Sequence, residues 1–142
     1  ALPICRADER SSDIASCHDA PVSTDRFADR LDPATYVNDD EVVGVYESDP
    51  SEADALWLSA RLFRRLTGVA RAYELHALPL LDDPDPVRLN RARCEAVLDE
   101  IAFVAERLDD QVAIGMAQSI ADYLSARTRR PTWDGPVTFE GD

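Results

Sequence analysis

Apolar residues recur at helical spacing over a long stretch in the first half of the chain. Positions 56, 60, 63, 66, 70, 73 and 77 are apolar, one residue every three or four. Asp49, Pro50 and Glu52 form a helix start signal: an N-cap, a proline at the first position, and an acid that can reach back to the cap amide. The pattern predicts a helix over 50–77, with Gly68 as its weak point.

Two further helices are predicted in the second half. After a second Asp-Pro start signal, apolar side chains recur on one face of residues 86–108, at Val87, Cys94, Val97, Ile101 and Val104. Asp109 or Asp110 can cap the next helix, which is predicted over 110–129 and ends before Pro131. Because no Gly or Pro separates the two, a single bent helix is the alternative, although typical helix lengths favour two.

Short β-prone segments lie on either side of these helices. Residues 35–37 and 41–46 are rich in β-branched and aromatic residues and flank a turn-like Asn-Asp-Asp, which predicts one or two strands. An Asp-Gly turn precedes an alternating stretch over 136–140 that can pair with 42–46. The predicted fold is therefore mainly α: a bundle of about three helices with a small antiparallel β element formed near residues 35–47 and 136–140.

The chain length fits one domain. Its 142 residues lie near the common domain size, and residues 1–23 differ from the rest in being polar with scattered apolar positions. We expect an N-terminal arm over 1–23 and a single mainly helical domain over 24–142. No apolar run approaches the roughly 20 residues that span a bilayer, so no membrane contact is predicted. A cytoplasmic location is expected, with export left open because residue 1 is Ala.

The charge balance is strongly acidic, with a formal net charge of -13. This excess repels nucleic acids and anionic membranes and attracts basic proteins or cations. We therefore expect a basic protein partner and no direct nucleic-acid binding. Every basic side chain other than His is Arg, which indicates codon usage in a GC-rich, bacterial genome.

The cysteines and histidines do not form a recognisable catalytic group. Cys94 lies on an apolar helix face and is interpreted as core. Cys5 and Cys17 can form a disulfide only in an oxidising compartment, and with His18 they supply three zinc ligands where a structural site needs four. His76, in the last turn of the first predicted helix, fits an interaction with the helix dipole.

Metal and cofactor sites are not predicted elsewhere either. Asp82, Asp83 and Asp85 offer carboxylate oxygens to a divalent cation, but Asp85 serves the helix start and no second acidic motif completes a site. Glycine-rich phosphate loops and the Gly-x-Ser-x-Gly elbow do not occur in the sequence. We therefore expect no enzyme activity, no metal and no cofactor.

A row of arginines interrupts the acidic character along one side of the first predicted helix. It comprises Arg61, Arg64, Arg65 and Arg71. The row is interpreted as pairing with acids on a neighbouring helix or as solvated, and binding of an anionic ligand or a phosphate is the alternative.

The leading functional hypothesis is an acidic protein-binding module. Its concrete form is a bacterial immunity protein or inhibitor that neutralises a basic, nuclease-like toxin or mimics the charge of nucleic acid. Acids on turns and caps are the expected binding groups, with Trp57 as an aromatic anchor if it is exposed rather than in the core. The predicted partner-binding residues are Asp39, Asp40, Glu41, Asp82, Asp83, Asp109, Asp110 and Trp57.

Two other classes of function remain as alternatives. A structural or regulatory helical subunit would form homo-oligomers through the apolar face of the second or third helix. An enzyme with an unrecognised carboxylate pair would instead be expected to purify with a bound metal or cofactor.

Overall fold

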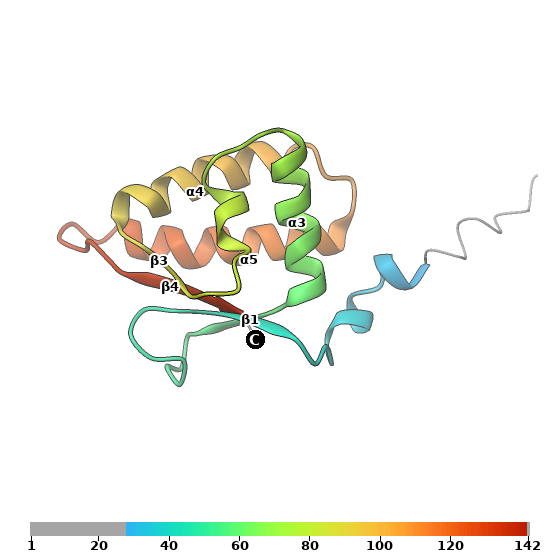
Figure 1. Ribbon diagram of the computed structural model, residues 1–142, viewed down its shortest axis with the longest axis horizontal. Helices are drawn as coiled ribbons and strands as arrows, with labels where there is room; N and C mark the ends of the chain where they lie inside the picture. Colours follow the sequence, from blue (N-terminus) through green and yellow to red (C-terminus); the bar gives the residue numbers. More distant parts are fainter. Residues whose placement is uncertain (1–27, 142) are drawn as a thin grey trace, which may run out of the picture. The chain divides into compact units, whose positions relative to one another are not determined.

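The computed structural model describes residues 28–141, and residues 33–142 form one compact unit. The unit has a sheet with α-helices packed on one of its faces (Figure 1). Its elements in chain order are the 3-10 helix η3 (Pro33–Tyr36), strands β1 (Val42–Tyr46) and β2 (Leu56–Ser59), helix α3 (Ala60–Ala72), the 3-10 helix η4 (Leu78–Leu81), strand β3 (Val87–Leu89), helices α4 (Arg91–Ala105) and α5 (Gln111–Thr128), and strand β4 (Val137–Gly141). A further 3-10 helix, η2 (Ala28–Leu31), precedes this unit.

The four strands form an antiparallel sheet in the order β2-β1-β4-β3. The C-terminal strand β4 therefore lies inside the sheet, and β2 and β3 are its edges. The predicted pairing of the C-terminal strand with residues 42–46 is confirmed, with Gly44 opposite Glu140 and Tyr46 opposite Thr138.

Alternation along the strands separates the helix-covered face of the sheet from the opposite face. Val43 and Val45 point toward the helices and are buried, as are Leu58 and Phe139. The Phe139 ring stacks on Phe63 of α3, with centroids 6.1 Å apart. The core thus lies between the sheet and α3, α4 and α5.

The prediction of a mainly α bundle is wrong, because the protein is a mixed α/β fold with a four-stranded sheet. The largest error is the helix expected over 50–77. Its first part is strand β2, which pairs with β1, and α3 begins only at Ala60. The start signal acts in a turn instead: the Glu52 carboxylate accepts the backbone N–H groups of Glu47, Ser48 and Asp49.

The actual start of α3 is capped by Ser59. Its hydroxyl accepts the backbone N–H of Leu62 at 3.2 Å, so one residue ends the strand and caps the helix. The helix ends at Ala72, and the chain then turns through Glu74 at φ 58°. The expected position of His76 in a helical last turn is therefore wrong: its backbone N–H donates to the Glu100 carboxylate.

The two later helices are closer to expectation. Within the predicted helix 86–108, residues 87–89 form strand β3 because they pair with β4. Helix α4 starts after Asn90, whose side chain accepts the N–H of Arg93. Helix α5 matches the predicted range, with Asp110 as its cap, and it is separate from α4. The prediction of a core position for Cys94 is also confirmed, since its side chain is buried.

Of the one or two strands predicted over residues 35–46, the structure contains one. Residues 33–36 form the 3-10 helix η3 and only 42–46 form a strand. Cys5, Cys17, His18 and the arm over 1–23 lie outside the described residues. No helix within residues 28–141 is long and apolar enough to cross a membrane.

Candidate functional site

Each arginine of the row on α3 pairs with an acid, and the acids come from three different segments of the chain. The pairs are Arg61 with Asp39, Arg64 with Glu41, Arg65 with Asp110 and Arg71 with Asp82. The row is thus ion-paired, although its partners lie on loops and at a helix cap and not within a neighbouring helix, where they are expected. The acids come from loops and from the cap of α5, so the row connects α3 to the rest of the unit.

Asp39 has the least exposed side chain of these four acids. Its carboxylate accepts hydrogen bonds from the Arg61 guanidinium, at 2.9 Å, and from the Ser59 hydroxyl. These two bonds hold the pKa of Asp39 below its ordinary range. Asp39 therefore fixes the loop before β1 against the start of α3.

Four of the seven predicted binding acids are thus engaged within the protein: Asp39, Glu41, Asp82 and Asp110. The other three, Asp40, Asp83 and Asp109, are exposed and form no ion pair with another described residue. Asp83 is held in its turn by accepting the backbone N–H of Asp85 at 2.9 Å. Asp83 lines a small hollow together with the paired acids Glu41 and Asp82, whereas Asp40 and Asp109 do not line it.

Trp57 is exposed, whereas a tryptophan on an apolar helix is more often core. It lies on strand β2, on the sheet face opposite the helices, and 57% of its surface is accessible. The ring lies across Gly44 of β1, where an added Cβ would come within 3.0 Å of the ring carbon Cζ3. Glycine at this position therefore allows the indole to lie flat on the sheet.

A shallow groove of about 310 Å³ runs beside Trp57, between η3, the edge strand β2 and α5. We name it the Trp57 groove; its apolar walls include Tyr36, Val37, Trp57, Leu62, Val112 and Met116. Val37 is 74% exposed at this site. Tyr36 is held by Arg65, which donates to its hydroxyl at 3.0 Å, and by Arg61, whose guanidinium lies 5.2 Å from its ring centroid.

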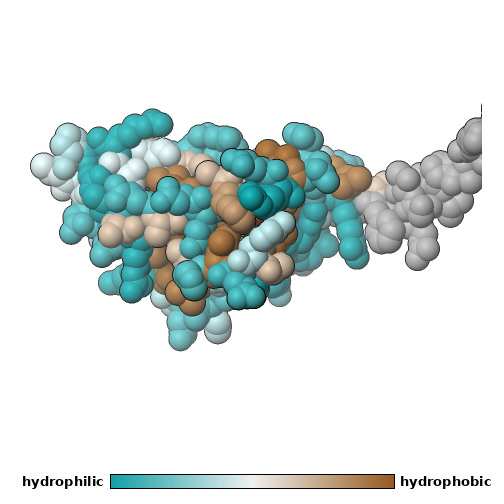
Figure 2. Space-filling view, turned by 90° about the horizontal axis from the view of Figure 1, so that it is seen from above, coloured by the Kyte–Doolittle hydropathy of each residue, from teal (hydrophilic) through white to brown (hydrophobic). Residues whose placement is uncertain are grey.

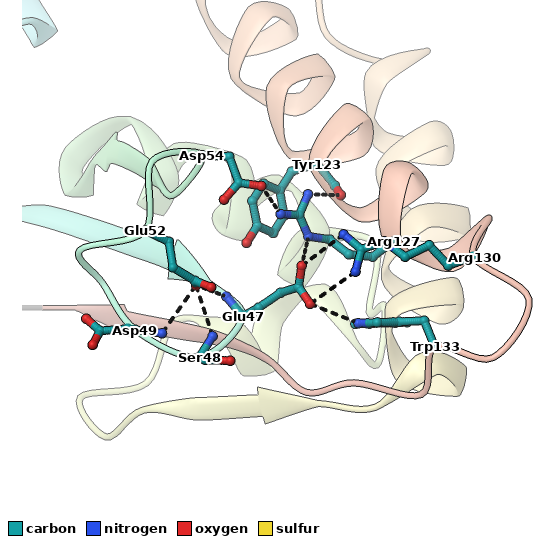
Figure 3. Close-up of polar contacts among 9 residues, drawn as sticks. All are labelled: Glu47, Ser48, Asp49, Glu52, Asp54, Tyr123, Arg127, Arg130 and Trp133. Atoms are coloured by element: carbon teal, nitrogen blue, oxygen red, sulfur yellow. Dashed lines mark hydrogen bonds and ion pairs between the residues drawn. The ribbon is translucent and has the colours of Figure 1, made fainter.

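A second group of polar residues, which sequence reasoning missed, surrounds Arg127 at the end of α5 (Figure 3). Its side chain is buried, with the guanidinium 3.5 Å from the Tyr123 ring centroid. It donates to Glu47 at 3.0 Å and to Asp54, and both acids come from the loop between β1 and β2. The group therefore ties that loop to α5.

The charges in this group hold one another in their ionised forms. Although burial raises the pKa of Glu47, hydrogen bonds from Arg130 and Trp133 and the charge of Arg127 outweigh burial and lower it. Burial also raises the pKa of Tyr123 to about 12, and its buried hydroxyl has no hydrogen-bond partner among residues 28–141. Both shifts move the pKa of the group away from neutral pH.

The spacing of Tyr123 and Arg127, four residues apart on one helix, is a signal that the two side chains meet. The acids bound by Arg127, Glu47 and Asp54, are more than 70 residues away from it in the chain, and no local pattern indicates them. Within residues 28–141, no three His, Cys, Asp or Glu side chains are grouped to hold a metal ion. In the loop at 82–85, the Asp82 carboxylate forms an ion pair with Arg71.

Comparison of the chain with protein-family models, curated proteins and solved structures finds no match. Function is therefore inferred from the surface itself. Its two most distinctive features are the Trp57 groove and the exposed acids Asp40 and Asp109, which lie close in sequence to residues that line the groove.

Proposed function

We propose that this protein is a protein-binding module that takes an apolar side chain of a basic partner into the Trp57 groove. The observation that carries the proposal is the exposure of Trp57 beside a groove with apolar walls. Tryptophan is enriched among residues that dominate binding energy, because its large ring loses little conformational entropy on binding. Large exposed apolar side chains next to a groove are typical of interaction sites.

Charge supports a basic partner. The chain has a formal net charge of -13, and exposed acids lie close in sequence to both walls of the groove. Asp40 follows Val37 by three residues, and Asp109 precedes Gln111 at the start of α5. A partner segment with an apolar residue flanked by Lys or Arg fits such a surface, because complementary charge speeds encounter and favours one orientation.

Within this class, an inhibitor of a basic, nuclease-like toxin fits the charge. A protein that grips nucleic acid presents a positive surface, and an acidic partner can occupy that surface and exclude nucleic acid. An immunity protein or a mimic of nucleic-acid charge would act in this way. The supporting feature is the charge of the chain, together with an aromatic anchor to hold the complex once formed.

The experiment begins with capture of partners from a lysate of the source organism at low salt. The captured partner is expected to be basic, and its association rate should fall markedly between low and physiological ionic strength while dissociation changes less. Replacing the three exposed acids together, by Asp40→Asn, Asp83→Asn and Asp109→Asn, should slow association in the same way. Binding kinetics at several salt concentrations measure both effects.

The control is a variant of equal charge change that replaces three exposed neutral residues away from the Trp57 groove by Arg: Ala72→Arg, Ala92→Arg and Ala126→Arg. It separates the overall charge of the molecule from the position of the acids. Recovery of an acidic partner, or an association rate indifferent to salt and to the three Asn substitutions, would reject the proposal.

A homo-oligomeric subunit is the second candidate, favoured by a shallow apolar groove between α4 and α5. Leu98, Ile101, Ala105, Ile114 and Ala121 line it, and the helical side of the molecule exposes hydrophobic surface among hydrophilic side chains (Figure 2). If copies associate here, the protein sediments as an oligomer at micromolar concentration and Ala102→Arg, at the same groove, returns it to a monomer. A wild-type monomer at that concentration contradicts this candidate.

A further inference from the structure

The opposite edge of the sheet carries a hollow that the proposed function does not use. It has a volume of about 260 Å³ and lies between η4, strand β3 and α4. Its walls are mostly apolar, with Leu80, Leu81, Val87, Leu89 and Val97 among them. Leu80 is 65% exposed beside it, so apolar surface here is open to solvent.

The polar groups at this hollow differ in how well they are satisfied. The Glu100 carboxylate accepts the backbone N–H groups of His76, Ala77 and Leu78, at 3.1, 2.9 and 2.7 Å, and so caps the turn before η4. The side chains of Arg93 and His76, in contrast, make no hydrogen bond or ion pair with another described residue. The Glu100 carboxylate is therefore already hydrogen-bonded, whereas the side chains of Arg93 and His76 are not bonded to another described residue.

This pattern is the reverse of the one on α3. There, each of the four arginines has a carboxylate partner supplied by the fold. At the hollow, a guanidinium and an imidazole stand at the edge of apolar walls in a protein with many acids. A guanidinium binds a carboxylate with strong, charge-assisted hydrogen bonds, and apolar walls bind a hydrocarbon group.

We propose that this hollow binds a small carboxylic acid with a short hydrocarbon tail. The tail lies against Leu80, Leu81 and Val97, and the carboxylate faces Arg93 and His76. The volume limits the size of the ligand, because sites for drug-sized molecules have roughly 300–1,000 Å³. The inference is independent of the Trp57 groove, which lies at the other edge of the sheet.

The test is a titration of the full chain with octanoate, followed by amide chemical shifts in NMR spectra. Octylammonium and 1-octanol have the same tail with a positive or neutral head and serve as matched probes. Octanoate is expected to shift amides of η4, β3 and the first turns of α4 with saturation. It should bind at least about tenfold more tightly than either probe, because only its carboxylate forms charge-assisted hydrogen bonds with the guanidinium.

The variant Arg93→Gln is expected to weaken octanoate binding by about tenfold or more. Arg88→Gln is the control: Arg88 lies on the same strand as Val87 and Leu89, but successive strand residues point to opposite faces, so it removes an equal charge away from the hollow. Equal binding of octanoate and octylammonium, equal effects of the two variants, or no shifts at the hollow up to millimolar octanoate would overturn the proposal. Spectral dispersion like that of the wild type shows that each variant is folded.

Discussion

Arg127 illustrates how this protein accommodates a buried positive charge. Its guanidinium bonds Glu47 and Asp54 and lies over the Tyr123 ring, while Glu47 is also bonded by Arg130 and Trp133. A buried ion must be paired, because an unpaired one loses its hydration without compensation. The pairing also has a structural role, because it holds the β1–β2 loop against α5.

The variant Arg127→Met is expected to lower the free energy of unfolding by about 3 kcal/mol, the lower end for a broken buried pair, because Glu47 keeps two other partners. Arg130→Met is the control, since Arg130 contacts the same carboxylate but its side chain is 48% exposed. Its cost should stay below about 1 kcal/mol. Urea denaturation measures both, and equal costs would show that burial of Arg127 contributes nothing.

Acid should destabilise the protein through the carboxylates whose pKa is lowered in the folded state, among them Asp39, Glu47 and Asp54. Each folded pKa lies below the unfolded value, so the stabilisation is complete above the unfolded pKa, near 4. It is lost as pH falls through the folded pKa.

Denaturation midpoints measured from about pH 7 down to about pH 3 should therefore fall mainly below about pH 4.5. In Arg127→Met the fall should be shallower, because Glu47 and Asp54 then titrate closer to their ordinary range. An identical pH dependence in the two proteins would show that Arg127 does not control these carboxyl groups.

At the residue scale, the sequence predicts hydrogen bonds between neighbouring residues better than it predicts the helix, strand or turn in which they lie. Glu52 was expected to reach back to the Asp49 amide, and it does so at 3.2 Å, but in a turn and not at a helix start. The sequence leaves Asp109 or Asp110 as the cap of α5, and the structure shows that Asp110 is the cap. Trp57 was assigned to a helix, and its exposure depends on Gly44, whose position beneath the ring no local pattern indicates.

At the element scale, the two errors in helix length have one cause. Residues 56–59 and 87–89 have apolar residues that fit a helical period, yet both form strands because another strand lies beside them. Pairing with β1 and β4 is a long-range interaction, and it overrides local preference in short segments. Helix α5 has no such competitor, and its predicted range is close to the observed one.

Helix α3 contains a glycine that the fold does not need. A Cβ at Gly68 would meet no atom within 4 Å, so Gly68→Ala should raise the free energy of unfolding by about 1 kcal/mol through the lower backbone entropy of the unfolded chain. Gly135→Ala should lower it, because Gly135 has φ 106° and its Cβ would lie 2.9 Å from the Leu89 carbonyl oxygen. Urea denaturation that shows Gly68→Ala to be destabilising would contradict the described packing of α3.

At the scale of the whole molecule, the sequence gives the net charge but does not predict which acids remain unpaired on the surface. Four of the seven acids expected to bind a partner are neutralised by the arginine row of α3. Pairing of this kind depends on which loops the fold places beside α3. The same limitation applies to the Trp57 groove, whose walls come from three segments that are far apart in sequence.

The most direct test of the Trp57 groove compares the affinity of the captured basic partner for Trp57→Ser and Leu80→Ser. Both substitutions remove an apolar side chain that is more than half exposed, 57% for Trp57 and 65% for Leu80, from opposite edges of the sheet. Trp57→Ser is expected to raise the dissociation constant by about 30-fold or more, as for a residue that dominates binding, and Leu80→Ser to leave it nearly unchanged. Equal affinities of the two folded variants, or a greater loss with Leu80→Ser, would contradict the assignment of the binding surface to the Trp57 groove.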